Sequence, residues 1–228
     1  MLFFDPIYLL FALPAIVLAL AAQLYVKYNF SKYSKIHASS GMSGAQAAYA
    51  MLVGAGVTNF RLERTSGILT DHYDPSSRTL RLSADVYDST SLAAIGVACH
   101  EAGHALQHSD AYLWLGLRSA LVPITNIGST LYYWIFIAGL FFHSQPLVYI
   151  GIGMFGLVVL FTLVTLPVEW NASSRAKKLM VSSGIVTASE AGRAGAVLNA
   201  AFMTYLASAI QALATLLYYI LRSRGRSR

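Results

Sequence analysis

The sequence predicts a mainly α-helical, multi-pass membrane protein with about four transmembrane helices and a small α/β region outside the bilayer. Of its 228 residues, 56% are hydrophobic and 11% are charged, whereas ordinary soluble domains contain about 25% charged residues. Four stretches contain no Asp, Glu, Lys or Arg, namely residues 6–26, 119–142, 144–168 and 194–221. Because a membrane span needs about 20 mostly apolar residues, each stretch is long enough to cross a bilayer.

This charge pattern divides the chain into five segments. They are an N-terminal transmembrane anchor (residues 1–27), an α/β region (28–119), a transmembrane hairpin (120–166), a helix with a polar connector (167–198), and a C-terminal hydrophobic helix with a basic tail (199–228). The first hydrophobic stretch lacks the basic start of a secretory signal and exceeds the roughly 7 to 15 apolar residues of a signal core. We therefore expect it to stay in the protein as an anchor.

The net charge of +6 does not indicate a nucleic-acid-binding protein. The basic residues are scattered beside the hydrophobic stretches and form no patch with interleaved aromatic residues. Anionic lipid headgroups explain this distribution, so the bilayer is an expected partner and nucleic acid is not. The single cysteine, Cys99, permits no internal disulfide and is expected to be a small core residue. The sequence indicates no oligomeric state.

Two helices are predicted between residues 28 and 119. Ser43 followed by Gln46 matches a capping box, which predicts the start of a short helix. Ser89 or Ser91 is predicted to cap a second helix, from Leu92 to about His108. This second helix carries the residues that point to chemistry.

Three short strands are predicted between these two helices, at residues 57–63, 67–73 and 79–83. The last two flank Asp74-Pro75-Ser76-Ser77, whose residue types favour a turn. They are therefore predicted to pair as a hairpin.

His100-Glu101-Ala102-Gly103-His104 is an H-E-x-x-H motif. On a helix, two histidines four residues apart lie on the same face and can bind one zinc ion. A catalytic zinc takes three protein ligands and leaves a fourth position for water, which Glu101 is placed to deprotonate as a general base. The alternative is that the histidines cap or hydrogen-bond within a polar helix at the membrane surface.

A third histidine on the same helix does not complete the site. At about 1.5 Å per residue, His108 lies roughly 12 Å along the helix axis from His100, which is too far to share one ion. The metzincin pattern requires a glycine three residues after His104 and a histidine three residues later, and Gln107 and Asp110 stand there.

Glu169 is the better candidate for the third ligand. It is the only acid between Asp110 and Glu190, and it follows Pro167 by two residues at the end of the third hydrophobic stretch. A lone carboxylate so close to lipid calls for a partner. The alternative is an interfacial glutamate paired with Arg175.

At these residues the chain resembles the YugP-type family of bacterial multi-pass membrane zinc metallopeptidases. The resemblance covers nearly the whole chain and rests on several separate blocks. These blocks are Phe4-Asp5-Pro6, Tyr33-Ser34-Lys35, Ala38-Ser39-Ser40-Gly41, Leu69-Thr70-Asp71-His72-Tyr73-Asp74-Pro75, the run from His100 to His108, Arg118-Ser119-Ala120-Leu121-Val122-Pro123, and Leu166-Pro167-Val168-Glu169-Trp170-Asn171-Ala172-Ser173.

The resemblance implies a small gluzincin-like α/β catalytic domain with a short antiparallel sheet and an H-E-x-x-H helix. Glu169 to Ser173 then resembles the glutamate-ligand helix of related membrane proteases. Those relatives usually have an aspartate where Ser173 stands, and such an aspartate orients a zinc histidine. The resemblance leaves that orienting role to Asn171, Ser173 or another group.

The resemblance also implies a role for the hairpin that bears Asp71, His72 and Tyr73. It precedes the metal helix, as the substrate-binding edge strand does in gluzincins, so an extended peptide is expected to pair with it. His72 or Tyr73 would either polarise the substrate carbonyl or stabilise the hairpin by a hydrogen bond.

The resemblance implies a bacterial inner-membrane protein, and the distribution of basic residues predicts that its active site is at the cytoplasmic face. The transmembrane hairpin returns the chain to the side it left, so the polar segments before and after it share one side. Counting Lys27, these segments carry twelve Lys and Arg residues against four in the C-terminal tail, and the positive-inside rule favours the larger group inside. The tail opposes this assignment, so either the rule is overruled or the last stretch does not cross completely.

Three functions fit the sequence. The first is a zinc-dependent endopeptidase, with one Zn²⁺ per chain on His100, His104 and Glu169, that hydrolyses membrane-associated or misfolded polypeptides by a Glu-activated, zinc-bound water. The second is a site-2-type intramembrane protease, which the acids flanking the metal helix disfavour. The third is a non-catalytic membrane scaffold or assembly factor stabilised by zinc, which would require a fourth protein ligand.

Overall fold

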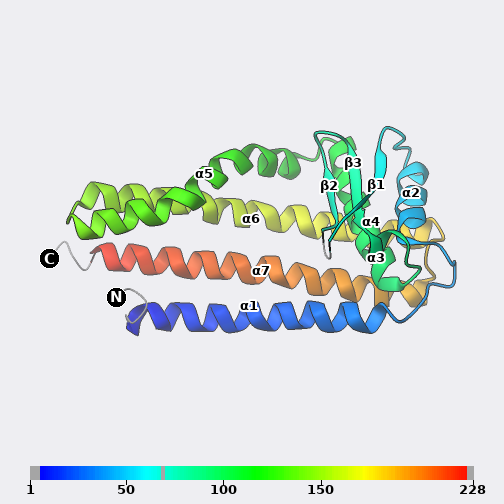
Figure 1. Cartoon of the computed structure of the whole chain (residues 1–228), viewed down its shortest axis with the longest axis horizontal. Helices are drawn as coiled ribbons and strands as arrows, with labels where there is room; N and C mark the ends of the chain where they lie inside the picture. Colours follow the sequence, from blue (N-terminus) through cyan, green and yellow to red (C-terminus); the bar gives the residue numbers. More distant parts are fainter. Residues whose placement is uncertain (1–5, 68–69, 225–228) are drawn as a thin grey trace. The chain divides into compact units, whose positions relative to one another are not determined.

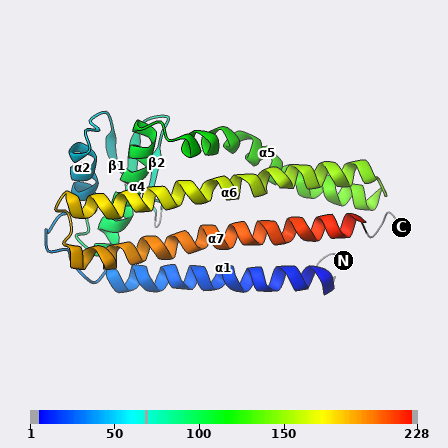
Figure 2. The same cartoon turned by 180° about the vertical axis from the view of Figure 1, so that it is seen from behind.

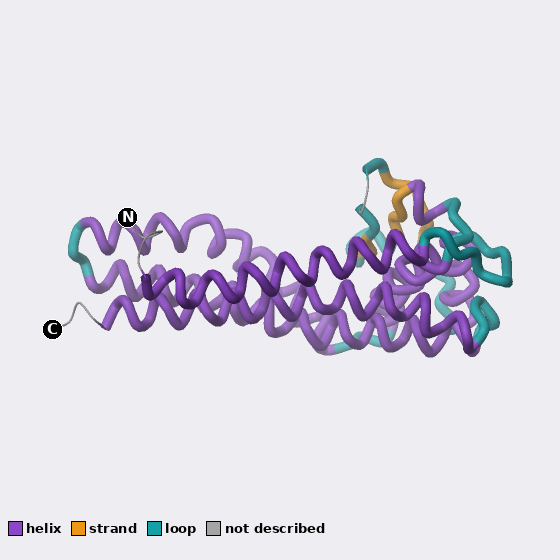
Figure 3. The backbone as a smooth tube through the Cα atoms, turned by 90° about the horizontal axis from the view of Figure 1, so that it is seen from below, coloured by secondary structure: helices purple, strands orange, loops and turns teal. Residues whose placement is uncertain are grey.

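The structure is a computed structural model that describes residues 6–67 and 70–224 and is mainly helical (Figures 1 and 3). Residues 1–5 of the anchor, 68–69 of the second predicted strand and 225–228 of the tail lie outside the described residues. The predicted class of a mainly α-helical, multi-pass membrane protein with a small sheet is confirmed. The elements, in chain order, are α1 (Pro6–Tyr33), α2 (Gly44–Gly54), β1 (Arg61–Thr65), β2 (His72–Asp74), β3 (Thr79–Ser83), α3 (Ala84–Tyr87), α4 (Leu92–Ser109), α5 (Leu113–Phe141), α6 (Gln145–Ser182) and α7 (Ala188–Arg224).

Four helices, α1, α5, α6 and α7, are long and apolar enough to cross a membrane (Figure 2). They contain the four charge-free stretches, except for residues 142 and 144 at the link between α5 and α6, and each helix extends beyond its stretch. The 38 residues of α6 span about 57 Å at 1.5 Å per residue, whereas a bilayer core is about 30 Å thick. The third hydrophobic stretch and the helix that carries Glu169 are therefore one uninterrupted helix, with Pro167 inside it.

Among the described residues, the chain forms two compact units. Unit 1 draws on residues 6–22, 116–167 and 204–224, and unit 2 on residues 23–67, 70–115 and 168–203. Unit 1 is built from parts of the four long helices. Unit 2 contains the sheet, the short helices and the H-E-x-x-H helix α4.

The core of unit 1 is aromatic. The rings of Phe136 on α5 and Tyr219 on α7 lie 4.3 Å apart, and those of Tyr132 and Phe155 lie 4.6 Å apart. Helices α5 and α6 approach closely at Gly151, where a Cβ atom would lie 2.8 Å from the Cβ of Phe136. Small residues at such contacts let membrane helices pack backbone to backbone.

Unit 2 contains a three-stranded sheet in the order β1-β3-β2. Strands β2 and β3 pair antiparallel, with Tyr73 opposite Leu80, which confirms the predicted hairpin. Strand β1 runs parallel to β3, with Leu62 opposite Leu80, so the sheet is mixed rather than wholly antiparallel. Leu80 and Leu82 of the central strand are fully buried.

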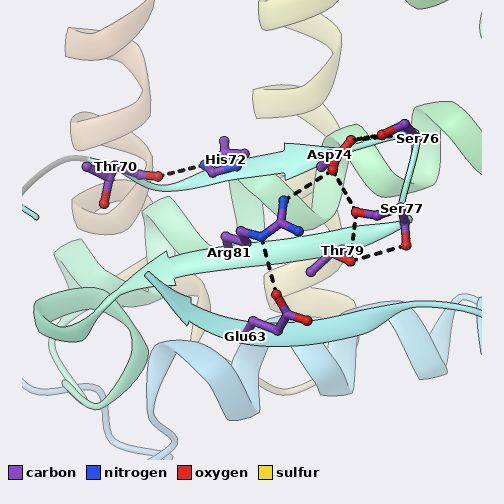
Figure 4. A network of polar contacts seen from close by, with 8 residues as sticks. All are labelled: Glu63, Thr70, His72, Asp74, Ser76, Ser77, Thr79 and Arg81. Atoms are coloured by element: carbon purple, nitrogen blue, oxygen red, sulfur yellow. Dashed lines mark hydrogen bonds and ion pairs between the residues drawn. The ribbon is translucent and has the colours of Figure 1, made fainter. Parts of the chain in front are cut away.

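The turn between β2 and β3 is held by the Asp74 carboxylate, as Figure 4 shows. It accepts hydrogen bonds from the hydroxyl groups of Ser76 and Ser77 and from the backbone N–H of Ser76, and Arg81 donates to it at 3.1 Å. These donors stabilise the charged carboxylate and lower the pKa of Asp74. Arg81 also pairs with Glu63 on β1, so one guanidinium links all three strands.

The core of unit 2 forms around α4. Ser43 makes the predicted capping box with Gln46 at the start of α2, and Met51 and Leu52 of that helix join the hydrophobic core to which α4 contributes. Helix α4 begins at the predicted N-cap Ser91, whose hydroxyl accepts from the N–H of Ala94. The predicted inner face of α4 is fully or almost fully buried, at Leu92, Ile95, Cys99 and Leu106.

Candidate metal centre

Three predicted side chains converge in unit 2. The Nε2 atoms of His100 and His104 lie 3.2 and 3.6 Å from the same oxygen, Oε2 of Glu169. The ligand atoms of the three residues lie within 4.8 Å of one another. Glu169 is 1% exposed and His104 is 8% exposed, so this is a buried cluster of polar groups. Buried groups of this type require charged or hydrogen-bonding partners.

Helix geometry and one glycine bring the three groups together. His100 and His104 are one turn apart on α4, with ring centroids 4.8 Å apart and planes nearly perpendicular. Glu169 lies on α6, which reaches α4 closely because Gly103 has no side chain. A Cβ atom at Gly103 would lie 2.6 Å from the backbone oxygen of Ala172 on α6.

The outer nitrogens of both imidazoles have protein partners. His100 Nδ1 lies 3.1 Å from the Ser173 hydroxyl, and His104 Nδ1 lies 3.0 Å from Oε1 of Gln107. The Gln107 amide in turn donates to the backbone oxygen of Val168 and to the Asn171 side chain. Ser173 thus contacts one histidine directly, whereas Asn171 contacts the other through Gln107.

Gln107 is a residue that sequence reasoning missed. It occupies a non-matching position of the metzincin pattern, so in the sequence it argues only against that class. Its side chain is fully buried in an apolar helix, three residues after His104. The signal in the sequence is the spacing: Gln107 follows His104 by three residues, so both lie on the same helix face. A buried amide there needs a hydrogen-bond partner within the protein.

The donor set fits a zinc ion. A catalytic zinc binds three protein ligands at about 2.0 to 2.1 Å, and tetrahedral donors at that radius lie about 3.3 Å apart. The two nitrogen-to-oxygen distances, 3.2 and 3.6 Å, lie close to this value. Burial lowers the pKa of His104, but the hydrogen bond and charge of Glu169, the charge of Glu101 and the hydrogen bond with Gln107 together outweigh burial, so the pKa is raised. The Glu169 carboxylate, which favours a proton on His104, would favour a bound cation in the same place.

Glu101, the predicted base, is half-buried on α4 beside His100. Its carboxylate is close enough to His104 to act on it electrostatically. Arg175, the alternative partner considered for Glu169, forms an ion pair with Asp110 and donates to Asn171. It therefore ties the end of α4 to α6.

Asp71, His72 and Tyr73, the candidates for substrate binding, lie at the start of β2 or directly before it and make separate contacts. Asp71 accepts hydrogen bonds from the backbone N–H and the hydroxyl of Ser83, at the start of α3. The His72 ring lies 2.8 Å from the backbone oxygen of Thr70 (Figure 4). The Tyr73 hydroxyl lies 2.8 Å from Nδ1 of His108. The first two contacts stabilise the local structure, whereas the third joins β2 to α4.

An H-E-x-x-H helix with a glutamate beside its two histidines, in a chain with four candidate membrane spans, is the arrangement expected of a membrane zinc peptidase. Residues 8–224 match the family described as "Putative neutral zinc metallopeptidase", and the chain belongs to this family. It is 43% identical over 215 residues to "Putative membrane protease YugP" of Bacillus subtilis (strain 168), which covers 94% of this chain and 96% of that relative. No solved structure matches the chain.

Proposed function

We propose that this protein is a zinc-dependent membrane endopeptidase that hydrolyses membrane-associated or misfolded polypeptides. One zinc ion per chain would be held by His100, His104 and Glu169, with Glu101 as the general base. The observation that carries this proposal is the approach of both histidine Nε2 atoms to one buried carboxylate oxygen. Family membership supports the same activity.

The side chains around the centre have distinct tasks in this mechanism. When bound, zinc supplies Lewis-acid chemistry, which polarises a carbonyl and makes water more acidic. Glu101 accepts the proton of the attacking water as its oxygen bonds to the carbonyl carbon, and then gives that proton to the amine as the C–N bond breaks. Oε1 of Gln107 only accepts, so it favours the proton on Nδ1 of His104 and leaves Nε2 free to act as a ligand, and the Ser173 hydroxyl can accept the Nδ1 proton of His100 in the same way.

Two structural observations favour this function over the alternatives. The cluster contains three His, Cys, Asp or Glu ligands among the described residues, whereas a structural zinc usually has four. Helix α4 is not among the four candidate spans, whereas an intramembrane protease would carry its metal helix within the bilayer. We further propose that the centre faces the cytoplasm, on the basis of the twelve basic residues beside the hydrophobic stretches.

The test compares three variants of the full-length protein, purified in detergent. Glu101→Gln should retain zinc and lose cleavage of an unfolded polypeptide, because it removes the proton acceptor but no ligand. Glu169→Ala should lose zinc, measured by elemental analysis after dialysis. The control Glu63→Gln removes an exposed acid on β1 and should keep both properties. Normal cleavage by Glu101→Gln would refute the assigned base, and unchanged zinc in Glu169→Ala would remove that residue from the site.

A further inference from the structure

A cavity of about 360 Å³ lies in unit 2, outside the candidate metal centre. Its walls come from the loop between α2 and β1 (residues 56–60), from the β2–β3 hairpin and from the second half of α4. The hairpin contributes Tyr73 and Arg78, and α4 contributes Ala105, His108 and Ser109. Cavities of this size that contain a few polar groups are typical of ligand sites.

The cavity begins one helical turn from the metal ligands. Ala105 directly follows His104 in the chain, and His108 lies about 6 Å from His104 along the axis of α4. Tyr73 belongs to β2, which pairs with β3 on one side only and is an edge of the described sheet. A peptide that extends the sheet along this edge would present alternate side chains to one face of the sheet. The cavity therefore lies where a substrate residue near the scissile bond would insert.

The charges that line the cavity are of one sign. Arg78 is its charged residue, His108 is its second basic group, and no acid is among its lining residues. The Arg78 side chain makes no hydrogen bond or ion pair with the part of the chain that the structure describes, so its guanidinium is available to a ligand. A guanidinium in such a position matches a carboxylate in shape and charge.

The contact between Tyr73 and His108 adds a second donor. Burial is the main reason that the pKa of Tyr73 is raised, so its hydroxyl keeps its proton. That hydroxyl can donate to His108 Nδ1, 2.8 Å away. When Nδ1 accepts this hydrogen bond, the imidazole carries a proton on Nε2, which is then a donor. The cavity thus offers donors from α4 as well as from the hairpin.

The backbone at Arg78 has an uncommon conformation for a residue with a side chain. Arg78 has φ = 51°, in the left-handed region that glycine adopts at the least cost. Hairpin turns commonly place glycine or asparagine at such positions. Strained positions of this kind cluster at functional sites. An arginine that adopts this strained backbone conformation and lines a cavity fits a binding role.

We propose that this cavity binds a carboxylate of the substrate polypeptide, with Arg78 as the charged partner and His108 as a second donor. The carboxylate belongs either to an aspartate or glutamate near the scissile bond or to the C-terminus of the substrate. This inference rests on the proposed peptidase function and specifies its substrate preference.

The experiment uses the full-length zinc-loaded protein in detergent and one fluorescent peptide series. Each peptide carries Glu, Gln or Lys at one position, and this position is moved along the peptide from one set to the next. Every peptide is made with a free and with an amidated C-terminus. Cleavage is measured with the wild type, and binding is measured with Glu101→Gln. At one position, Glu should exceed Gln in kcat/KM and in affinity by about 10-fold to 100-fold, as for a charge-assisted hydrogen bond. A preference for the free C-terminus instead would identify the terminal carboxylate.

Three variants assign the preference to the cavity. Arg78→Gly relieves the left-handed backbone and should stay folded while the Glu and Gln peptides become equivalent. Arg78→Glu should favour Lys over Glu. The control Arg61→Glu makes the same charge change at an exposed position of β1 and should leave the preference unchanged.

The outcomes separate the two proposals. Selective binding of carboxylate peptides without any cleavage would overturn the peptidase function and keep the pocket. Cleavage with no carboxylate preference, or a preference that survives in Arg78→Gly, would overturn the pocket and keep the peptidase function.

Discussion

Replacing Gly103 by alanine should separate α4 from α6 at the candidate metal centre. The new Cβ atom would lie 2.6 Å from the backbone oxygen of Ala172, whereas ordinary contacts begin at 3.4 Å. One helix must therefore move by about 0.8 Å, and overpacking of this kind costs about 1 to 3 kcal/mol. Since Glu169 lies one turn before Ala172 on α6, the same movement shifts a ligand. Displacements near 1 Å at a catalytic group reduce activity by about 100-fold.

Gly192→Ala is the matched control, because Gly192 is also helical, belongs to unit 2 and has no atom within 4 Å of its added Cβ. Both variants gain about 1 kcal/mol of helix propensity, so the difference between them isolates the clash. Thermal unfolding in detergent, retained zinc after dialysis, and kcat/KM on an unfolded substrate would be measured for each. Relative to the control, Gly103→Ala should unfold at a lower temperature, retain less zinc and cleave about 100-fold more slowly. Equal values for both variants would refute the close approach of α4 and α6 as the cause of ligand convergence.

Three further results are expected. Gln107→Leu leaves buried groups around His104 unpaired, so zinc affinity measured by chelator competition should fall by about 10-fold to 100-fold, and an unchanged affinity would contradict the orienting role. Cys99 is fully buried and its pKa is raised by burial, so iodoacetamide should modify it only after denaturant opens α4; rapid labelling of the native protein would contradict that packing. The lowered pKa of Asp74 means that its stabilising effect is present above the ordinary pKa of aspartate and is lost as pH falls through the lowered value. Thermal unfolding from pH 6 downward should therefore show a smaller acid-induced loss for Asp74→Asn than for the wild type, and identical profiles would argue against the turn network.

The features that sequence reasoning predicted correctly depend on local signals. Ser43 and Gln46 form a capping box within one turn, and Asp74 to Ser77 form a turn within four residues, so neighbouring residues suffice to specify both. The hydrophobic stretches identify the long helices by composition alone. The spacing of His100 and His104 implies a shared face on any helix. Glu169 is the only acid between Asp110 and Glu190, and a lone carboxylate so close to lipid predicts a partner for it.

The features that were missed depend on distant parts of the chain. Strand β1 pairs in parallel with β3, and no local signal gives the direction of a strand relative to a distant one. Pro167 suggested a boundary, yet α6 continues through it, because surrounding contacts can hold a helix together at a proline. The role of Gln107 requires Val168, which lies 61 positions later in the sequence. Only the folded chain brings those atoms together.

The separation of the ligands along the chain has a consequence for biosynthesis. His100 and Glu169 lie 69 positions apart, and the chain between them includes α5 and much of α6. A ribosome that has produced the H-E-x-x-H segment must still deliver two hydrophobic helices before the third ligand exists. With the proposed ligand set, the nascent protein would lack one ligand while its own unfolded segments emerge, and the proposed hydrolytic activity would begin only when membrane insertion is almost finished.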